Sequence, residues 1–152
     1  MDLYRIILVD DEEEVRQSII RKIDWTGAGF CVVGDAENGE EALARMGEIK
    51  PDIVITDIRM PVMDGLELIE ACSREGYRCH FILLTGYKEF EYAKRAMRYG
   101  VKHYILKPTD PELLIKALKE EMEDVAAEQK EAEAREKMQK RFEKVATKAV
   151  EQ

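Results

Sequence analysis

Residues 52–65 read DIVITDIRMPVMDG, and this stretch decides the fold. Its apolar run at 53–55 is short, β-branched and continuous, which is typical of a strand covered on both faces. Asp57 follows the run, and a proline and a glycine then indicate a turn. Leu66, Ile69 and Cys72 come next at helical spacing. The stretch therefore predicts a strand, a turn and a helix, with a carboxyl group where the strand ends.

The same pattern recurs through the first 110 residues or so. Short apolar runs stand at 6–9, 31–33, 53–55, 81–84 and 104–106, and amphipathic segments separate them. One of these segments places Phe90, Ala93 and Met97 on one helix face, ahead of a capping Gly100. Strands that alternate with helices imply right-handed crossovers and a parallel sheet covered on both faces. We predict a doubly wound α/β domain whose ligands bind beyond the carboxyl ends of its strands.

The rest of the chain has a different composition. Residues 109–112 (Thr-Asp-Pro-Glu) predict a helix start, and neither glycine nor proline occurs from 112 to 152. Two heptad registers, offset by one residue, are formed by Leu118, Met122, Val125 and Ala132 and by Met138, Phe142, Val145 and Ala149. We expect a domain at 1–120 and a helical tail at 121–152. The tail either pairs with a partner helix or is a frayed linker.

Composition excludes several classes of protein. The chain has 152 residues, a net charge of −8 and a pI near 5.0, which argues against a self-sufficient nucleic-acid-binding domain. It has no apolar run of roughly 20 residues and no signal-peptide pattern. Cys31, Cys72 and Cys79 lack the spacing of a zinc site. These features favour a reduced, soluble, cytoplasmic protein that does not bind membranes.

Polar residues stand at four of the expected strand ends. Asp10 and Asp11 follow the first run, Asp57 the third, Thr85 the fourth and Lys107 the fifth. Each alone has an ordinary structural reading, such as a helix cap, but parallel strands bring all four ends to one edge. Clustered carboxylates repel one another without a cation, and oxygen ligands suit Mg²⁺. A lysine and a hydroxyl beside them suit an anionic oxygen, so the set predicts a phosphoryl site.

Four motifs give the chain a family resemblance. Residues 8–12 (LVDDE), 52–65, 84–86 (LTG) and 104–108 (YILKP) resemble receiver domains of two-component response regulators. The resemblance covers residues 3–120 and implies a flavodoxin-like fold of five parallel strands and five helices, the last extended into the charged C-terminal helix. Residues 24–30 and 86–93 are similar to receivers of AraC-type (YesN-like) transcriptional response regulators.

The resemblance also implies roles for individual residues. Asp57 would be the phosphoacceptor, phosphorylated by a sensor histidine kinase. The implied magnesium ligands are Asp10, Asp11, Asp57 and the backbone carbonyl of Arg59. Thr85 and Lys107 would bind phosphoryl oxygens, and Thr85 and Tyr104 would form the switch. The Lys107–Pro108 bond is expected to be cis.

At the level of function, the resemblance implies a phosphorylation-activated receiver that catalyses only its own phosphorylation and dephosphorylation. We expect a homodimer on activation, formed through the helix at 90–99, the fifth strand and the C-terminal helix. The chain would be the N-terminal part of a DNA-binding transcriptional regulator whose output domain is absent from these residues. The alternative is a stand-alone receiver in a phosphorelay or an interaction module. Direct nucleic-acid binding by these residues is not expected.

Competing chemistries fit the motifs less well. An aspartyl phosphohydrolase needs an acid two residues after its nucleophile, where this chain has Arg59. A flavin or nucleotide binder needs a glycine-rich loop after its first strand, where residues 10–14 are all acidic. For Arg59 itself two roles remain open: it covers the site against water, or it pairs with Glu12 or Glu13.

Overall fold

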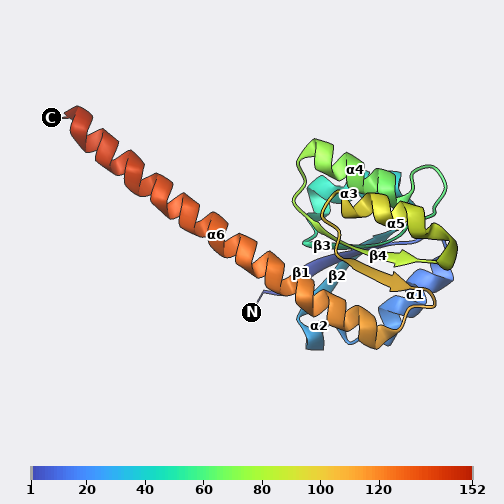
Figure 1. The fold of residues 1–152 in the computed structure, drawn as a ribbon. Helices are drawn as coiled ribbons and strands as arrows, with labels where there is room; N and C mark the ends of the chain where they lie inside the picture. Colours follow the sequence, from blue (N-terminus) through green and yellow to red (C-terminus); the bar gives the residue numbers. More distant parts are fainter. Residues whose placement is uncertain (1, 152) are drawn as a thin grey trace. The chain divides into compact units, whose positions relative to one another are not determined.

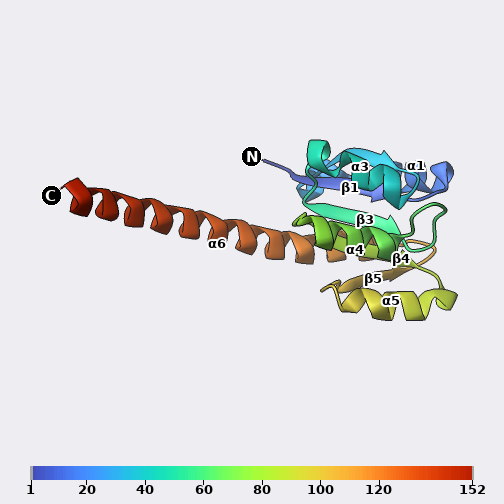
Figure 2. The ribbon, with the colours of Figure 1, turned by 90° about the horizontal axis from the view of Figure 1, so that it is seen from above.

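A five-stranded parallel sheet is the centre of the computed structural model, which describes residues 2–151. Its spatial order is β2-β1-β3-β4-β5 (Figures 1 and 2). The strands are β1 (Tyr4–Val9), β2 (Phe30–Ala36), β3 (Ile53–Asp57), β4 (His80–Thr85) and β5 (His103–Leu106). All five predicted strands are present, and the flavodoxin-like, doubly wound fold is confirmed.

Helices cover both faces of the sheet. In Figure 1, α3 (Gly39–Ile49), α4 (Gly65–Glu75) and α5 (Phe90–Met97) lie on one side, and α1 (Glu13–Lys22) lies on the other. The short helix α2 (Trp25–Ala28) is capped by the Asp24 side chain, and a 3-10 turn (Tyr87–Glu89) precedes α5. The last helix is α6 (Pro111–Glu151). Among residues 2–151, none of the helices has the length and apolar character that a membrane span requires.

The central strands are buried because both faces are covered. Residues Ile6–Val9 of β1 and Ile53–Ile55 of β3 have no exposed surface. Ile7, Val9 and Val54 pack into a core with Met46 and Leu68 from the helices of one face. Burying each such side chain contributes about 1.5–3 kcal/mol, which explains the continuous rather than alternating apolar runs.

Helix α5 differs from the prediction. Its expected buried face was Phe90, Ala93 and Met97, but Phe90 is 69% exposed and Met97 is 61% exposed. The small Ala96 is fully buried instead, and Ala93 is half-buried. The helix also ends at Met97, two residues before the expected end at 99. The helix therefore contacts the core through Tyr92, Ala93 and Ala96, whereas Phe90 and Met97 are turned to solvent.

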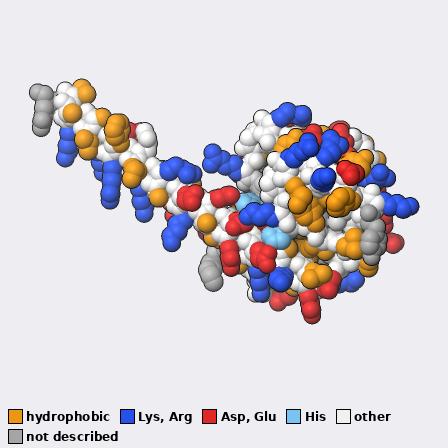
Figure 3. All heavy atoms as spheres, in the orientation of Figure 1, with side chains coloured by type: hydrophobic (Ala, Val, Ile, Leu, Met, Phe, Trp, Pro, Cys, Tyr) orange, Lys and Arg blue, Asp and Glu red, His pale blue; other side chains and the backbone are white. Residues whose placement is uncertain are grey.

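Helix α6 begins as the sequence predicts. The Asp110 side chain accepts a hydrogen bond of 2.9 Å from the Glu112 amide, and Pro111 occupies the first helical position. The helix is continuous for 41 residues. The chain divides into two compact units, one up to Glu121 and one from Met122. In the second unit Met138, Phe142 and Val145 are about 70% exposed, with apolar and basic side chains gathered on different sides of the helix (Figure 3).

A close backbone approach joins the end of β3 to the start of α4. A Cβ atom on Gly65 would lie 2.3 Å from the Asp57 carbonyl oxygen, and the Gly65 amide donates a 2.7 Å hydrogen bond to the Ile58 carbonyl. We expect Gly65→Ala to lower the free energy of unfolding by about 2 kcal/mol or more, because backbone must shift. Urea unfolding measures this difference.

The matched control for this substitution is Gly47→Ala, inside α3. Its nearest neighbour would be the Tyr77 hydroxyl at 3.6 Å, which is ordinary contact. Alanine should therefore raise the free energy of unfolding by up to about 1 kcal/mol through helix propensity. Equal effects of the two substitutions would contradict the role of close approach at Gly65.

Candidate functional site

Three carboxylates meet at the carboxyl edge of the sheet. Asp57 is the last residue of β3, and Asp10 and Asp11 directly follow β1. One oxygen atom from each of the three lies within 4.8 Å of the others. Asp10 and Asp57 are buried, whereas Asp11 is exposed. The structure therefore brings together the three acidic residues that the sequence predicts as a cluster.

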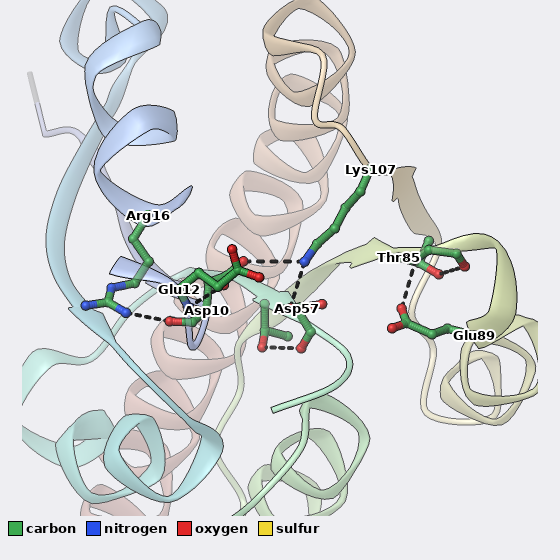
Figure 4. Close-up of polar contacts among 9 residues, drawn as sticks. Asp10, Glu12, Arg16, Asp57, Thr85, Glu89 and Lys107 are labelled. Carbon is green, nitrogen blue, oxygen red and sulfur yellow. Dashed lines mark hydrogen bonds and ion pairs between the residues drawn. The ribbon is translucent and has the colours of Figure 1, made fainter. Parts of the chain in front are cut away.

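Lys107 supplies the positive charge of the cluster. Its Nζ atom lies 2.7 Å from Asp57 Oδ2 and 3.6 Å from Asp10 Oδ2 (Figure 4). Burial raises the pKa of the Asp57 carboxyl group to about 6, although the hydrogen bond from Lys107 opposes the rise. Burial alone would lower the pKa of Lys107, but the hydrogen bond to Asp57 and the charges of Asp57 and Asp10 raise it. The lysine therefore stays charged beside the two acids.

The donor atoms of the cluster fit a hard divalent cation. Asp10 Oδ2 and Asp57 Oδ1 are buried and have no hydrogen-bond partner within residues 2–151. A buried carboxylate oxygen without a partner is costly, and a cation would compensate this cost. All the available donor atoms are carboxylate oxygens. Such a set suits Mg²⁺ better than transition metals, which favour nitrogen and sulfur donors. The cluster therefore offers the donor set of a magnesium site.

Arg16 anchors the loop that carries Asp10. Its guanidinium donates a hydrogen bond to the Asp10 carbonyl at 2.6 Å (Figure 4). It donates a second hydrogen bond to the Asp35 carboxylate at 3.0 Å. The Glu12 amide in turn donates to Asp10 Oδ1 at 2.9 Å. Sequence reasoning missed Arg16. The only signal was a basic residue two positions after five consecutive acids, and its partner Asp35 lies on β2.

Thr85 and Tyr104 make contacts outside the carboxylate cluster. Thr85 ends β4, and its hydroxyl donates to the Gly86 carbonyl at 3.1 Å. Its own carbonyl accepts a 2.8 Å hydrogen bond from the Lys107 amide, which ties the two strand ends together. The half-buried Tyr104 hydroxyl donates to the Val101 carbonyl at 2.8 Å. Thr85 therefore lies beside the site with its hydroxyl turned to the backbone.

Arg59 takes a position that neither sequence interpretation included. Its guanidinium carbon lies 5.4 Å from the centre of the Tyr92 ring, a cation–π contact with α5. The side chain thus bridges from the loop after β3 to α5. Together with Asp11 and Asp64 it also lines a shallow depression beside the carboxylates. The Lys107–Pro108 peptide bond is cis, as expected.

Comparison with known proteins agrees with this geometry. The family model of the response regulator receiver domain matches residues 6–119. The chain belongs to the response regulator receiver family. This receiver is 47% identical over 118 residues to the transcriptional regulatory protein YesN of Bacillus subtilis, covering 78% of this chain and 32% of YesN. It is 34% identical over 108 residues to the transcriptional regulatory protein HptR of Staphylococcus aureus, covering 71% of this chain and 42% of HptR.

Solved structures resemble this receiver closely. The receiver domain of the response regulator AraT from Geobacillus stearothermophilus has 39% identity and a TM-score of 0.77, covering 84% of this chain and 98% of that one. A two-component transcriptional regulator AraC from Clostridium phytofermentans has 34% identity and a TM-score of 0.77, covering 83% and 98%. This chain spans less than half the length of the curated relatives YesN and HptR. The identities to YesN and to the two solved receivers confirm the predicted resemblance to AraC-type (YesN-like) receivers.

Proposed function

We propose that this receiver accepts a phosphoryl group from the phosphohistidine of a sensor kinase on the Asp57 carboxylate. The observation that carries the proposal is the position of Lys107 Nζ, 2.7 Å from Asp57 Oδ2, beside two buried carboxylate oxygens that lack hydrogen-bond partners within residues 2–151. A cation held by these oxygens would act together with Lys107 on a phosphoryl group, whose equatorial oxygens carry the negative charge.

The reaction is an in-line displacement at phosphorus. The bond from Asp57 oxygen to phosphorus forms while the bond from the kinase imidazole nitrogen to phosphorus breaks, and the imidazole leaves. With a pKa of about 6, Asp57 is mostly ionised at neutral pH and is available as the nucleophile. Mg²⁺ held by Asp10, Asp11, Asp57 and the Arg59 backbone carbonyl would neutralise phosphoryl charge. Lys107 would transfer its hydrogen bond from Asp57 to a phosphoryl oxygen.

Thr85 would report phosphorylation to the α5 surface. Its hydroxyl now donates to the Gly86 carbonyl, and rotation about the side chain would turn it to a phosphoryl oxygen. Movement of this loop would leave space for Tyr104. Its own strand, β5, carries the exposed Leu106, and α5 carries the exposed Phe90 and Met97. Exposed apolar groups on one face favour a protein partner. We therefore place the activation dimer on α5 and β5.

The test of this function is the oligomeric state with and without beryllofluoride and Mg²⁺, measured by light scattering after size exclusion. The switch predicts a monomer that becomes a dimer when the phosphoryl mimic is added. A dimer that does not respond to the mimic would support a plain interaction module instead.

We also propose that residues 1–120 and 121–152 are the receiver and linker of a longer, cytoplasmic, DNA-binding regulator. Support comes from the relatives YesN and HptR, both transcriptional regulatory proteins of which this chain covers 32% and 42%. In this proposal the receiver reaches DNA only through its output domain. The second candidate, a stand-alone receiver, has the same phosphorylation chemistry and differs only in lacking an output domain after the tail.

The tail suits parallel pairing of two copies. Met138, Phe142, Val145 and Ala149 occupy the a and d positions of two heptads. With Phe142 at a, the flanking g positions are Arg141 and Lys148 and the nearest e position is Ala146. Antiparallel pairing would bring Arg141 of one copy against Lys148 of the other. Parallel pairing brings Arg141 against Ala146, so charge repulsion disfavours the antiparallel form.

Substitution of Phe142 tests the tail. We expect Phe142→Glu to weaken the beryllofluoride-induced dimer at least about tenfold, because a charge would enter the apolar seam. Thr147→Glu adds the same charge on the outer side of the helix and should leave the dimer unchanged. Sedimentation equilibrium measures both variants, and equal dimerisation of the two would exclude a paired tail.

A further inference from the structure

A second polar cluster lies at the opposite edge of the sheet from Asp57. His80 is the first residue of β4 and His103 the first of β5. Because His103 aligns with Ile82, two residues after His80, both histidines lie on the same face of the sheet. Both contact Glu121, a residue of α6 whose side chain is only 2% exposed. His80 Nδ1 lies 2.7 Å from Oε2, and His103 Nδ1 lies 2.7 Å from Oε1.

His103 makes a second contact of the same kind. Its Nε2 atom lies 2.7 Å from Glu120 Oε2, so both ring nitrogens face carboxylate oxygens. An ionised carboxylate only accepts hydrogen bonds, and a neutral imidazole has only one N–H to donate. Both contacts are therefore satisfied only when His103 carries two protons. With both glutamates ionised, the geometry therefore fits the imidazolium form.

The titratable groups around His103 come from β4, from α6 and from the segment before β5. They are His80 on β4, Glu120 and Glu121 on α6, and the neighbouring Lys102; Asp124 lies in the next turn of α6. Burial opposes the charge on His103, but the hydrogen bonds and charges of Glu120 and Glu121 outweigh it and raise the pKa. Burial likewise opposes the charge on Glu121, and the two histidines lower its pKa. In Figure 3 histidine side chains lie at the surface beside acidic ones.

We propose that His80, His103, Glu120 and Glu121 form a proton-operated clamp that holds the base of α6 on the amino ends of β4 and β5. When His103 is protonated, Glu120 and Glu121 are both bound to it and the helix base is fixed. When the proton leaves, the Nε2 atom repels the Glu120 carboxylate and that contact opens. The receiver thereby gains a response to pH at the start of α6, separate from phosphorylation at the carboxyl edge of the sheet.

The sign of the pH dependence is set by the two shifts. The raised pKa of His103 gives a stabilisation that is complete below its ordinary pKa of about 6.5 and is lost as pH rises through the folded-state value. The lowered pKa of Glu121 gives a stabilisation that is complete above its ordinary pKa of about 4.3 and is lost at more acid pH. The clamp is therefore tightest from about pH 4.3 to 6.5.

The protonation state can be read directly by NMR on the full chain. The chain has only two histidines, so His80→Gln assigns the ring signals. We expect His103 to titrate above about 6.5 and to show protons on both ring nitrogens at pH 6. A titration at or below that value, or a single-proton tautomer at pH 6, would overturn the proposal. The same spectra recorded with a chelator should be unchanged; a change would identify a metal site instead.

The clamp itself is tested by hydrogen exchange of the amides at residues 114–121, corrected for intrinsic rates. We expect exchange to become several-fold faster from pH 6 to pH 8 in the native chain, with most of this step lost in His103→Gln and Glu120→Gln. Glu131→Gln, an exposed position on the same helix, is the matched control and should keep the step. Persistence of the full step in His103→Gln would disprove the clamp. Phosphoryl labelling of the same variants tests Asp57 separately.

Discussion

Asp57→Asn is expected to abolish labelling of the chain by acetyl phosphate and Mg²⁺. The neutral asparagine amide cannot replace the carboxylate as the nucleophile that attacks phosphorus. The substitution also removes one of the three clustered carboxylates. The fold should persist, because asparagine has nearly the same shape and relieves the repulsion between Asp57 and Asp10. Intact-mass spectrometry detects the adduct, and its lability in base identifies an acyl phosphate.

Asp110→Asn is the matched control for this substitution. Asp110 lies three residues after Lys107 and caps α6 through the Glu112 amide, and asparagine caps a helix equally well. Labelling should therefore be unchanged in this variant. Full labelling of Asp57→Asn at another residue would contradict the site assignment, whatever the family of the chain.

Asp11→Asn is expected to weaken Mg²⁺ binding by at least roughly 10–100-fold. Loss of an outer-shell partner already weakens metal binding by this factor, and Asp11 is proposed as a direct ligand. Asp11 is the exposed member of the cluster, so its replacement should disturb packing less than replacement of the buried Asp10. Titration calorimetry measures the affinity. Labelling should fall in parallel and recover partly at high Mg²⁺, and removal of Mg²⁺ by a chelator should stop it in the native chain.

Asp64→Asn controls for the loss of a nearby negative charge. Asp64 lines the same depression as Asp11 and caps α4 through the Glu67 amide, a bond that asparagine also makes. Magnesium affinity should change little in this variant. Equal losses in Asp11→Asn and Asp64→Asn would mean that Mg²⁺ responds only to net charge and that Asp11 is not a ligand.

The sheet was predictable because its signal is local. Continuous apolar runs such as 53–55 identify buried strands, and alternation with helices identifies the parallel order. The convergence of Asp10, Asp57 and Lys107 followed from that order alone, since the carboxyl ends of parallel strands share one edge. Their separations, 2.7 Å and 3.6 Å from Lys107, required the structure.

Other features depend on contacts that no local pattern records. The predicted buried face of α5 was wrong. Phe90 and Met97 have the spacing of a buried stripe, yet Ala96 and its neighbours Tyr92 and Ala93 pack on the core instead. Arg16 with Asp35, and His103 with Glu121, pair residues 19 and 18 positions apart on different elements. The direction in which the Thr85 hydroxyl points is a rotamer choice, which sequence does not determine.

The uninterrupted helix from Pro111 to Glu151 restricts how the chain can be lengthened or spliced. Each residue inserted into an α-helix turns everything after it by about 100° and advances it by about 1.5 Å. Insertions of seven residues nearly restore the phase, whereas insertions of two nearly reverse it. Chimaeras that join this receiver to a foreign effector should therefore be built in whole heptads.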